Sequence, residues 1–157
     1  MKSISISDIG WAVLIGCIAT VYITRTGSFR HWYPPKGQFT GAFLANVSRA
    51  LRQRHLPLLV DVGGRPTLEQ EALFDDCTHA VLLAPDEAGL TDWQALAQRH
   101  NLPVLAELQS TLTETEAIYA DYPILRGRIA GLERQQPAQG ALVDLLAWNI
   151  RTLFSQN

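Results

Sequence analysis

Residues 56–108 read LPLLVDVGGRPTLEQEALFDDCTHAVLLAPDEAGLTDWQALAQRHNLPVLAEL, and this stretch decides the fold. Three apolar runs, at 56–60, 78–84 and 102–108, have the length and composition of strands that are buried on both faces. The segments between them are polar and carry helix-start signals. Strands that alternate with helices predict an α/β fold: a three-layer, Rossmann-like or P-loop-like parallel sheet with helices on both faces.

Capping signals predict where the helices begin. A threonine followed three positions later by Gln or Glu has the spacing of a capping box, and it occurs as Thr67 with Gln70, Thr91 with Gln94, and Thr113 with Glu116. The first box predicts a short helix through Phe74, and the second a helix through about His100. The third predicts another short helix.

Outside the central stretch, the pattern predicts a helix on each side and one more strand. Thr40 can cap a helix with an apolar stripe, from which the arginines stand apart as a solvated face: Arg49, Arg52 and Arg54. Residues 123–130 (PILRGRIA) predict a fourth strand, and residues 141–154 a final amphipathic helix.

The N-terminal residues 1–35 form a separate segment whose structure the sequence leaves open. Residues 9–24 (IGWAVLIGCIATVYIT) carry no charge, but a membrane span needs about 20 residues. The β-branched content favours one or two buried strands, with a membrane segment or a signal-peptide core as alternatives. For the whole of residues 1–35, an out-of-frame remnant of a truncated gene is a further alternative. Residues 36–157 are then the α/β domain, with membrane association possible only through residues 9–24.

Charge and cysteine content narrow the class of protein. Residues 1–56 carry a formal charge of +6, and residues 57–157 carry −8. This split argues against a protein that coats nucleic acid uniformly, so direct nucleic-acid binding is not expected. Cys17 and Cys77 lack metal-site spacing and are interpreted as small buried hydrophobic residues in a reducing compartment, which predicts a cytoplasmic protein.

The most unusual polar cluster follows the first predicted strand, in LLVDVGGRP. An acid that ends an apolar strand, followed by two glycines, has the pattern of a Walker-B strand, in which the acid binds Mg²⁺ directly or through water. Asp61 is therefore the candidate metal ligand, Gly63 and Gly64 would let the backbone approach a phosphate, and Arg65 could pair with phosphate oxygens. The structural alternative is a strand-ending Asp that caps a glycine turn.

A second basic cluster lies at Arg126-Gly127-Arg128, within the predicted fourth strand. Its arginines could bind phosphate, or they could simply share one face of an alternating strand. The printed sequence holds no G-x-x-x-x-G-K-[ST] loop. Without such a loop and its lysine, phosphoryl transfer lacks its anchor and its charge stabilisation, so competent ATP hydrolysis and catalytic residues are not expected.

Three segments, KGQFTGAFLANVSRAL (36–51), LPLLVDVGGRPTLEQEALFDDCTHAVLL (56–83) and PILRGRIAGLER (123–134), resemble a known family. It is the P-loop-NTPase-like domain that bacterial CRISPR loci carry fused to, or beside, a cyclic-oligoadenylate ring nuclease. The resemblance covers about residues 32–155, nearly four-fifths of the chain. This chain departs from the family at its front, where the family has a Walker-A loop and a Pro-Asp-Gly-Glu stretch before the Lys-Gly-x-Phe segment.

The resemblance implies an accessory P-loop-like domain in type III CRISPR antiviral defence, degenerate in its nucleotide site. It implies ATP and Mg²⁺ as possible ligands, with Asp61 as the Walker-B-type acid, and a ring nuclease or a second copy of the chain as possible partners. Two other readings of the residues stay open. One is a non-catalytic protein-interaction module with an exposed strand edge, and the other is an α/β domain anchored to a membrane by residues 9–24.

Overall fold

The computed structural model describes residues 40–53, 60, 66–132 and 138–155. The apolar run 9–24 and the boundary predicted near residue 35 lie outside the described residues, as does most of the first predicted strand. None of the helices within the described ranges has the length and apolarity that crossing a membrane requires.

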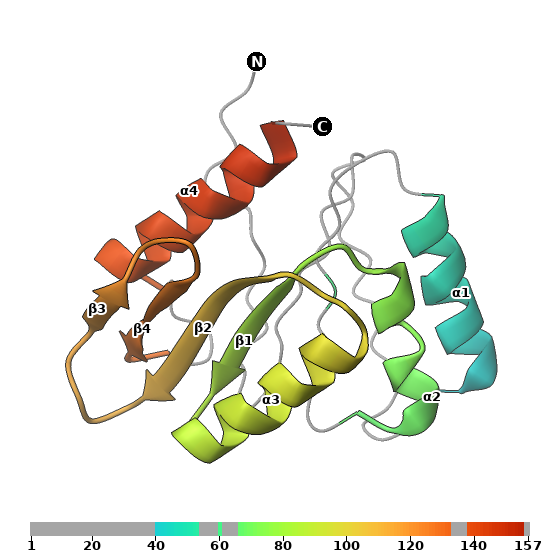
Figure 1. The fold of residues 1–157 in the computed structure, drawn as a ribbon, viewed down its shortest axis with the longest axis horizontal. Helices are drawn as coiled ribbons and strands as arrows, with labels where there is room; N and C mark the ends of the chain where they lie inside the picture. Colours follow the sequence, from blue (N-terminus) through green and yellow to red (C-terminus); the bar gives the residue numbers. More distant parts are fainter. Residues whose placement is uncertain (1–39, 54–59, 61–65, 133–137, 156–157) are drawn as a thin grey trace.

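Along the chain, three helical segments are followed by a strand, a helix, three consecutive strands and a final helix (Figure 1). In order they are α1 (Gly41–Arg52), α2 (Leu68–Glu71), the 3₁₀ turn η2 (Phe74–Asp76), β1 (Ala80–Ala84), α3 (Glu87–Arg99), β2 (Val104–Thr111), β3 (Ala117–Ala120), β4 (Leu125–Ala130) and α4 (Ala141–Ser155). The α/β class, the strands near 78–84, 102–108 and 123–130, and the final helix are confirmed.

The four described strands form one mixed sheet in the order β1-β2-β4-β3. β1 and β2 are parallel, as are β2 and β4, whereas β3 is antiparallel to β4. The prediction of a purely parallel sheet is therefore wrong at this end. Only residues 121–124 join β3 to β4, and so short a connection lets neighbouring strands run only in opposite directions.

Helices α3 and α4 pack against opposite faces of the sheet, because alternate residues of β1 belong to different core clusters. Leu82 packs in a cluster with Leu96 of α3 and Leu51 of α1. Its neighbour Leu83 packs in a second cluster with Leu142 of α4. Successive side chains of a strand point to opposite faces, so the first cluster lies on the α3 face and the second on the α4 face.

Close packing of α4 against the sheet depends on a glycine in β4. A Cβ atom added at Gly127 would overlap the Leu142 side chain and lie 2.6 Å from the carbonyl oxygen of Ala117. No side chain fits at this distance, so β4 carries glycine at the point where α4 and β3 both approach it.

Two of the predicted helix starts are confirmed. Thr40 Oγ1 accepts the amide of Phe43 at 3.3 Å and caps α1. Thr67 and Gln70 form the predicted capping box at α2, with donor–acceptor distances of 2.7 and 3.4 Å. The helix itself ends at Glu71, and the 3₁₀ turn η2 continues the segment to Asp76.

The two other predicted starts are wrong. Helix α3 begins at Glu87, because Asp86 caps it through a 2.7 Å hydrogen bond from the amide of Gly89. Thr91 lies inside α3 and donates its hydroxyl to the carbonyl of Glu87. After Thr113 the chain forms β3 instead of a helix, and two of its four residues, Ile118 and Tyr119, are of types enriched in strands.

Candidate functional site

Four of the six residues predicted to bind a cofactor lie outside the described residues: Asp61, Gly63, Gly64 and Arg65. Val60, the residue before Asp61, is described and is buried in the α3-face core with an exposed fraction of 4%. The other two, Arg126 and Arg128, are described and stand on β4.

Arg126 and Arg128 share one face of β4, as strand alternation predicts. They lie beside Glu107 and Gln109 of the neighbouring strand β2, their partners in the ladder. Glu107 is in turn the register partner of Leu82, whose side chain packs on the α3 face. We call these four residues the arginine face: Glu107, Gln109, Arg126 and Arg128.

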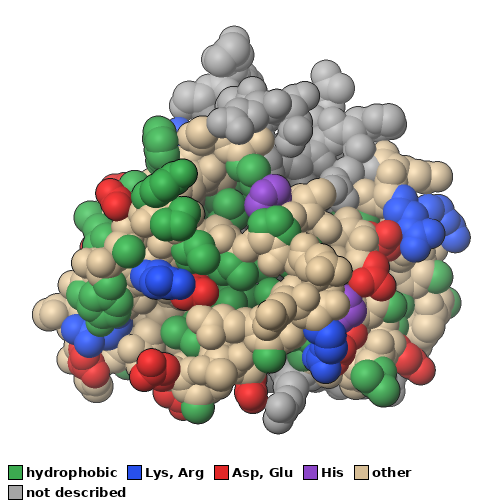
Figure 2. All heavy atoms as spheres, viewed as in Figure 1, with side chains coloured by type: hydrophobic (Ala, Val, Ile, Leu, Met, Phe, Trp, Pro, Cys, Tyr) green, Lys and Arg blue, Asp and Glu red, His purple; other side chains and the backbone are tan. Residues whose placement is uncertain are grey.

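Each arginine of this face is paired with a carboxylate. Arg126 Nε donates to Glu107 Oε2 at 2.6 Å, and the Glu107 side chain is only 10% exposed. Arg128 forms an ion pair with Glu114 and donates from Nε to the carbonyl of Thr115 at 3.1 Å. Basic and acidic side chains accordingly adjoin each other over this part of the sheet in Figure 2.

The electrostatic consequence is that the arginine face is balanced: two guanidinium groups face two carboxylates. An incoming phosphate would compete with Glu107 and Glu114 for the same donors and would be repelled by both. The structure thus brings the two predicted arginines together on one face. Arg126 links β4 to β2 through Glu107, and Arg128 links β4 to the segment before β3 through Glu114 and Thr115.

The carboxyl ends of the parallel strands, where ligands bind in open α/β sheets, are joined by local hydrogen bonds. Gln109 Nε2 donates to the carbonyl of Pro85 at 3.2 Å, which ties β2 to the turn between β1 and α3. The amide of Gly131 donates to the carbonyl of Thr111 at 3.0 Å, which extends the β2–β4 ladder. These contacts fix the edge that would have to receive a ligand.

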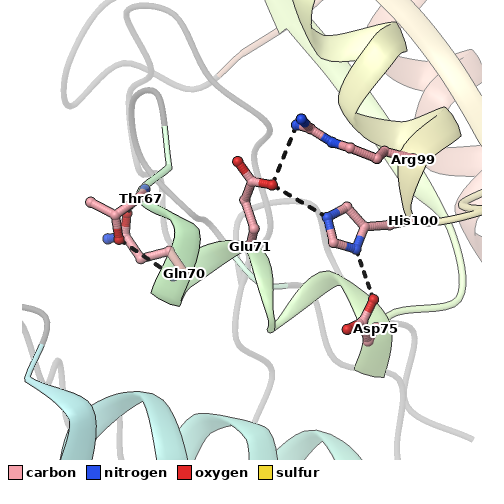
Figure 3. Close-up of polar contacts among 6 residues, drawn as sticks. All are labelled: Thr67, Gln70, Glu71, Asp75, Arg99 and His100. Carbon is pink, nitrogen blue, oxygen red and sulfur yellow. Dashed lines mark hydrogen bonds and ion pairs between the residues drawn. The ribbon is translucent and has the colours of Figure 1, made fainter.

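A second polar cluster links α2 and η2 to the end of α3 (Figure 3). His100 Nδ1 lies 2.7 Å from Asp75 Oδ1, and His100 Nε2 lies 3.5 Å from Glu71 Oε2. Arg99 Nη2 reaches the same Glu71 oxygen at 3.3 Å. The ring of His100 also packs edge-on against Phe74, with centroids 5.4 Å apart. We call His100, Asp75 and Glu71 the histidine clasp.

Topology places the histidine clasp at the amino ends of the strands. His100 comes shortly before β2 begins, and Asp75 comes shortly before β1 begins. The ligand crevice of an open α/β sheet lies at the opposite edge. The clasp therefore holds the α2–η2 segment on the domain, and a carboxylate–imidazole pair alone does not make it catalytic.

Replacing His100 should measure the strength of this clasp. We expect His100→Ala to lower the free energy of unfolding by about 1–2 kcal/mol, because it removes the bond to Asp75 and the ring contact with Phe74. Urea denaturation followed by far-UV circular dichroism is the measurement. The matched control is Arg99→Ala, whose longer contact at a 62% exposed side chain should be worth less than about 0.5 kcal/mol. Equal losses in the two variants would contradict the clasp.

Two further polar groups outside the arginine face and the histidine clasp are Asp76, with its hydrogen-bond donors, and His79. Asp76 accepts hydrogen bonds from the Ser48 hydroxyl at 2.5 Å and from Arg52 Nε at 2.8 Å. The hydrogen bond between Arg52 and Asp76, together with the negative charge of Asp76, raises the pKa of Arg52 above its usual value. Burial lowers the pKa of His79, whose Nδ1 has no hydrogen-bond partner within the described residues. His79 is partly buried and lies directly before β1.

Within the ranges that the structure describes, no group of three or more His, Cys, Asp or Glu side chains is arranged to hold a metal ion. The metal ligand predicted from the sequence, Asp61, lies outside those ranges. Comparison of the chain with models of protein families, with curated proteins and with solved structures found no match.

Sequence reasoning missed the histidine clasp and the partners of the two arginines. His100 lies 25 residues from Asp75, and Arg126 lies 19 residues from Glu107. Neither separation is a helical or strand repeat, so no local pattern signals the contact. The only usable signal is the register of β2 against β4, which a single sequence does not reveal.

Proposed function

We propose that this chain is an accessory P-loop-like domain of a type III CRISPR ring-nuclease system, without competent ATP hydrolysis of its own. In this proposal the sheet belongs to a three-layer Rossmann-like fold, and Asp61 ends a strand next to β1. The observation that carries it is the burial of Val60 in the core shared by β1, α1 and α3. Its burial directly before Asp61 supports a core position for LPLLV; the internal strand with an acid at its end belongs to the proposal, since Val60 itself lies in none of the described strands.

The proposed nucleotide site rests on Asp61, Gly63, Gly64 and Arg65. The ion pairs of Arg126 with Glu107 and of Arg128 with Glu114 argue that these two arginines serve the sheet and not a nucleotide. ATP with Mg²⁺ would then bind weakly, because one arginine and a glycine turn supply fewer phosphate contacts than a complete P-loop.

Calorimetric titration with ATP–Mg²⁺ tests this function. We expect weak binding that Asp61→Ala reduces by about ten-fold or more, and no release of phosphate above background. Arg126→Gln is the matched control, and it should leave binding unchanged. Multiple-turnover hydrolysis, or binding that is insensitive to Asp61→Ala, would contradict the proposal. An absence of binding at millimolar ATP would rule out a nucleotide-binding function and would leave a protein-interaction module as the candidate function.

The second candidate is a non-catalytic protein-interaction module. A specific observation favours it, namely that the sheet ends in a strand with exposed apolar side chains. Ile118 and Tyr119 of β3 have exposed fractions of 44% and 60%. The third reading, a domain anchored to a membrane, depends on residues 9–24, which lie outside the described residues.

A further inference from the structure

The strand β3 forms one end of the described sheet (Figure 1). It pairs with β4 on one side, and no other described strand pairs with its second side. Backbone N–H and C=O groups on such an edge are a template on which another extended segment can add.

Large apolar side chains surround this edge. Ile118 and Tyr119 are exposed, and Tyr122, in the connection to β4, is 85% exposed. Ile118 is the register partner of Gly127 and so stands on the α4 face, whereas Ala117 pairs with Arg128 on the other face. Figure 2 shows hydrophobic side chains gathered over the part of the molecule where β3 and α4 lie. Large exposed apolar side chains next to an unpaired strand edge are a feature of protein–protein contact sites.

The charge around the edge is negative. From residue 112 to residue 124 the chain carries Glu114, Glu116 and Asp121 and no Lys or Arg. Glu114 is paired with Arg128 of β4. Glu116 stands immediately before β3, with its carboxylate beside Gly140 at the start of α4, and Asp121 stands immediately after β3. A segment that adds to the whole of β3 therefore meets an acidic residue at each end.

This charge pattern disfavours a second copy of the chain as the occupant. The ladder of β3 is irregular between Ile118 and Ala120. If two copies of β3 paired antiparallel end to end, Glu116 of each copy would come beside Asp121 of the other. Like charges directly opposite each other in a sheet are destabilising. A strand with basic residues at those two positions would instead gain two ion pairs.

We propose that the edge of β3 binds an extended segment of a partner protein that is apolar in its middle and basic at both ends. This inference rests on the second candidate function and is independent of nucleotide binding. The segment adds as a strand against β3, places apolar side chains over Ile118 and Tyr119, and pairs its basic residues with Glu116 and Asp121. Backbone pairing supplies the affinity, and the two acidic residues select the charge of the partner.

Fluorescence anisotropy with labelled peptides tests the inference on the full chain. The probe is the blocked hexapeptide Lys-Thr-Val-Ile-Thr-Lys, and the control replaces both lysines by glutamate. We expect the basic peptide to bind about ten-fold more tightly than the acidic one at low salt, with the difference shrinking at high salt. Two further peptides have the same sequence but are N-methylated, one at the odd-numbered residues and the other at the even-numbered residues. At least one of them should lose binding, because the missing N–H donors prevent it from completing the ladder with β3.

Two double variants assign the binding to this edge. Glu116→Gln with Asp121→Asn should weaken binding of the basic peptide by about five-fold. Glu69→Gln with Glu87→Gln changes the net charge equally on α2 and α3 and should leave binding unchanged. Thermal denaturation of each variant confirms that it is folded.

Three results of the peptide experiments would each overturn the inference: no binding of the basic peptide at about 1 mM, equal weakening by both double variants, or unchanged binding of both N-methylated peptides. A homodimer in sedimentation equilibrium that the Glu116→Gln, Asp121→Asn variant strengthens would identify a second copy as the occupant, and would also overturn it. The ATP–Mg²⁺ titration measures nucleotide binding and its dependence on Asp61, whereas the peptide assay measures binding at β3. Failure of one test can therefore be told apart from failure of the other.

Discussion

Gly127→Ala is expected to lower the free energy of unfolding by about 3 kcal/mol, the largest effect of any single substitution considered for this chain. The added Cβ would overlap the Leu142 side chain and lie 2.6 Å from the Ala117 carbonyl oxygen. The leucine can change rotamer, but the carbonyl belongs to the backbone of β3 and can move only if the strand moves. Urea denaturation of the variant measures the loss.

Two controls separate this overlap from a general cost of replacing glycine. Gly41→Ala adds a Cβ with nothing within 4 Å at the start of α1, and it should be neutral or slightly stabilising. Leu142→Ala combined with Gly127→Ala should cost less than the sum of the two single variants, because the shortened side chain leaves room for the new Cβ. Strict additivity would show that α4 does not press on β4 at this point.

Gly140→Ala should have the second largest effect, a loss of about 2–3 kcal/mol. Gly140 precedes α4 with a φ of +133°, a conformation that residues with a Cβ rarely adopt. The position of the missing Cβ is also occupied, because the carboxylate of Glu116 lies against it. The substitution therefore strains the backbone and pushes a charged side chain away from the first turn of α4, where a negative charge is favourable.

Gly131→Ala distinguishes these two contributions. Gly131 has a φ of +65° but nothing within 4 Å of its missing Cβ, so alanine there meets only backbone strain of about 1 kcal/mol. A thermal denaturation series of the two variants gives the difference. If both substitutions cost the same, the Glu116 carboxylate contributes nothing to the entry of α4.

The two central strands could be predicted because burial on both faces leaves a continuous apolar run in the sequence. THAVLLA and LPVLAEL gave β1 and β2 within a few residues. Strand β2 continues three residues beyond the predicted run, to Thr111, because Gln109, Ser110 and Thr111 pair with β4 in the ladder. Hydropathy cannot show this extension, since polar residues lengthen a strand only when a neighbour supplies hydrogen bonds.

Competing local signals explain the two helix starts that were wrong. Asp86 and Thr91 both suit an N-cap, and the sequence does not rank them. Asp86 follows β1 by two residues and caps α3, because its side chain accepts the amide of Gly89. At Thr113 the capping pattern is present, but Thr111 Oγ1 accepts the amides of Thr113 and Glu114, which turns the chain toward β3.

In the candidate site, too, features that depend on local residue spacing could be predicted, and contacts between residues far apart in the sequence could not. Strand alternation correctly predicted that Arg126 and Arg128 share a face, because that depends only on a spacing of two. Their pairing with Glu107 and Glu114 depends on the β2–β4 register and on the path of the chain before β3. A phosphate-binding role could therefore be suggested from sequence but not weighed against the carboxylates that meet these arginines.

The strand order β1-β2-β4-β3 also determines when each strand can pair with its neighbours during synthesis. The last strand to leave the ribosome, β4, is the one that lies between its two predecessors. Until residue 130 has emerged, β2 has an open side and β3 has no described strand with which to pair. The β3 segment with its exposed Tyr119 thus stays unpaired on the nascent chain, and the apolar surface of β2 stays accessible to chaperones over the same interval.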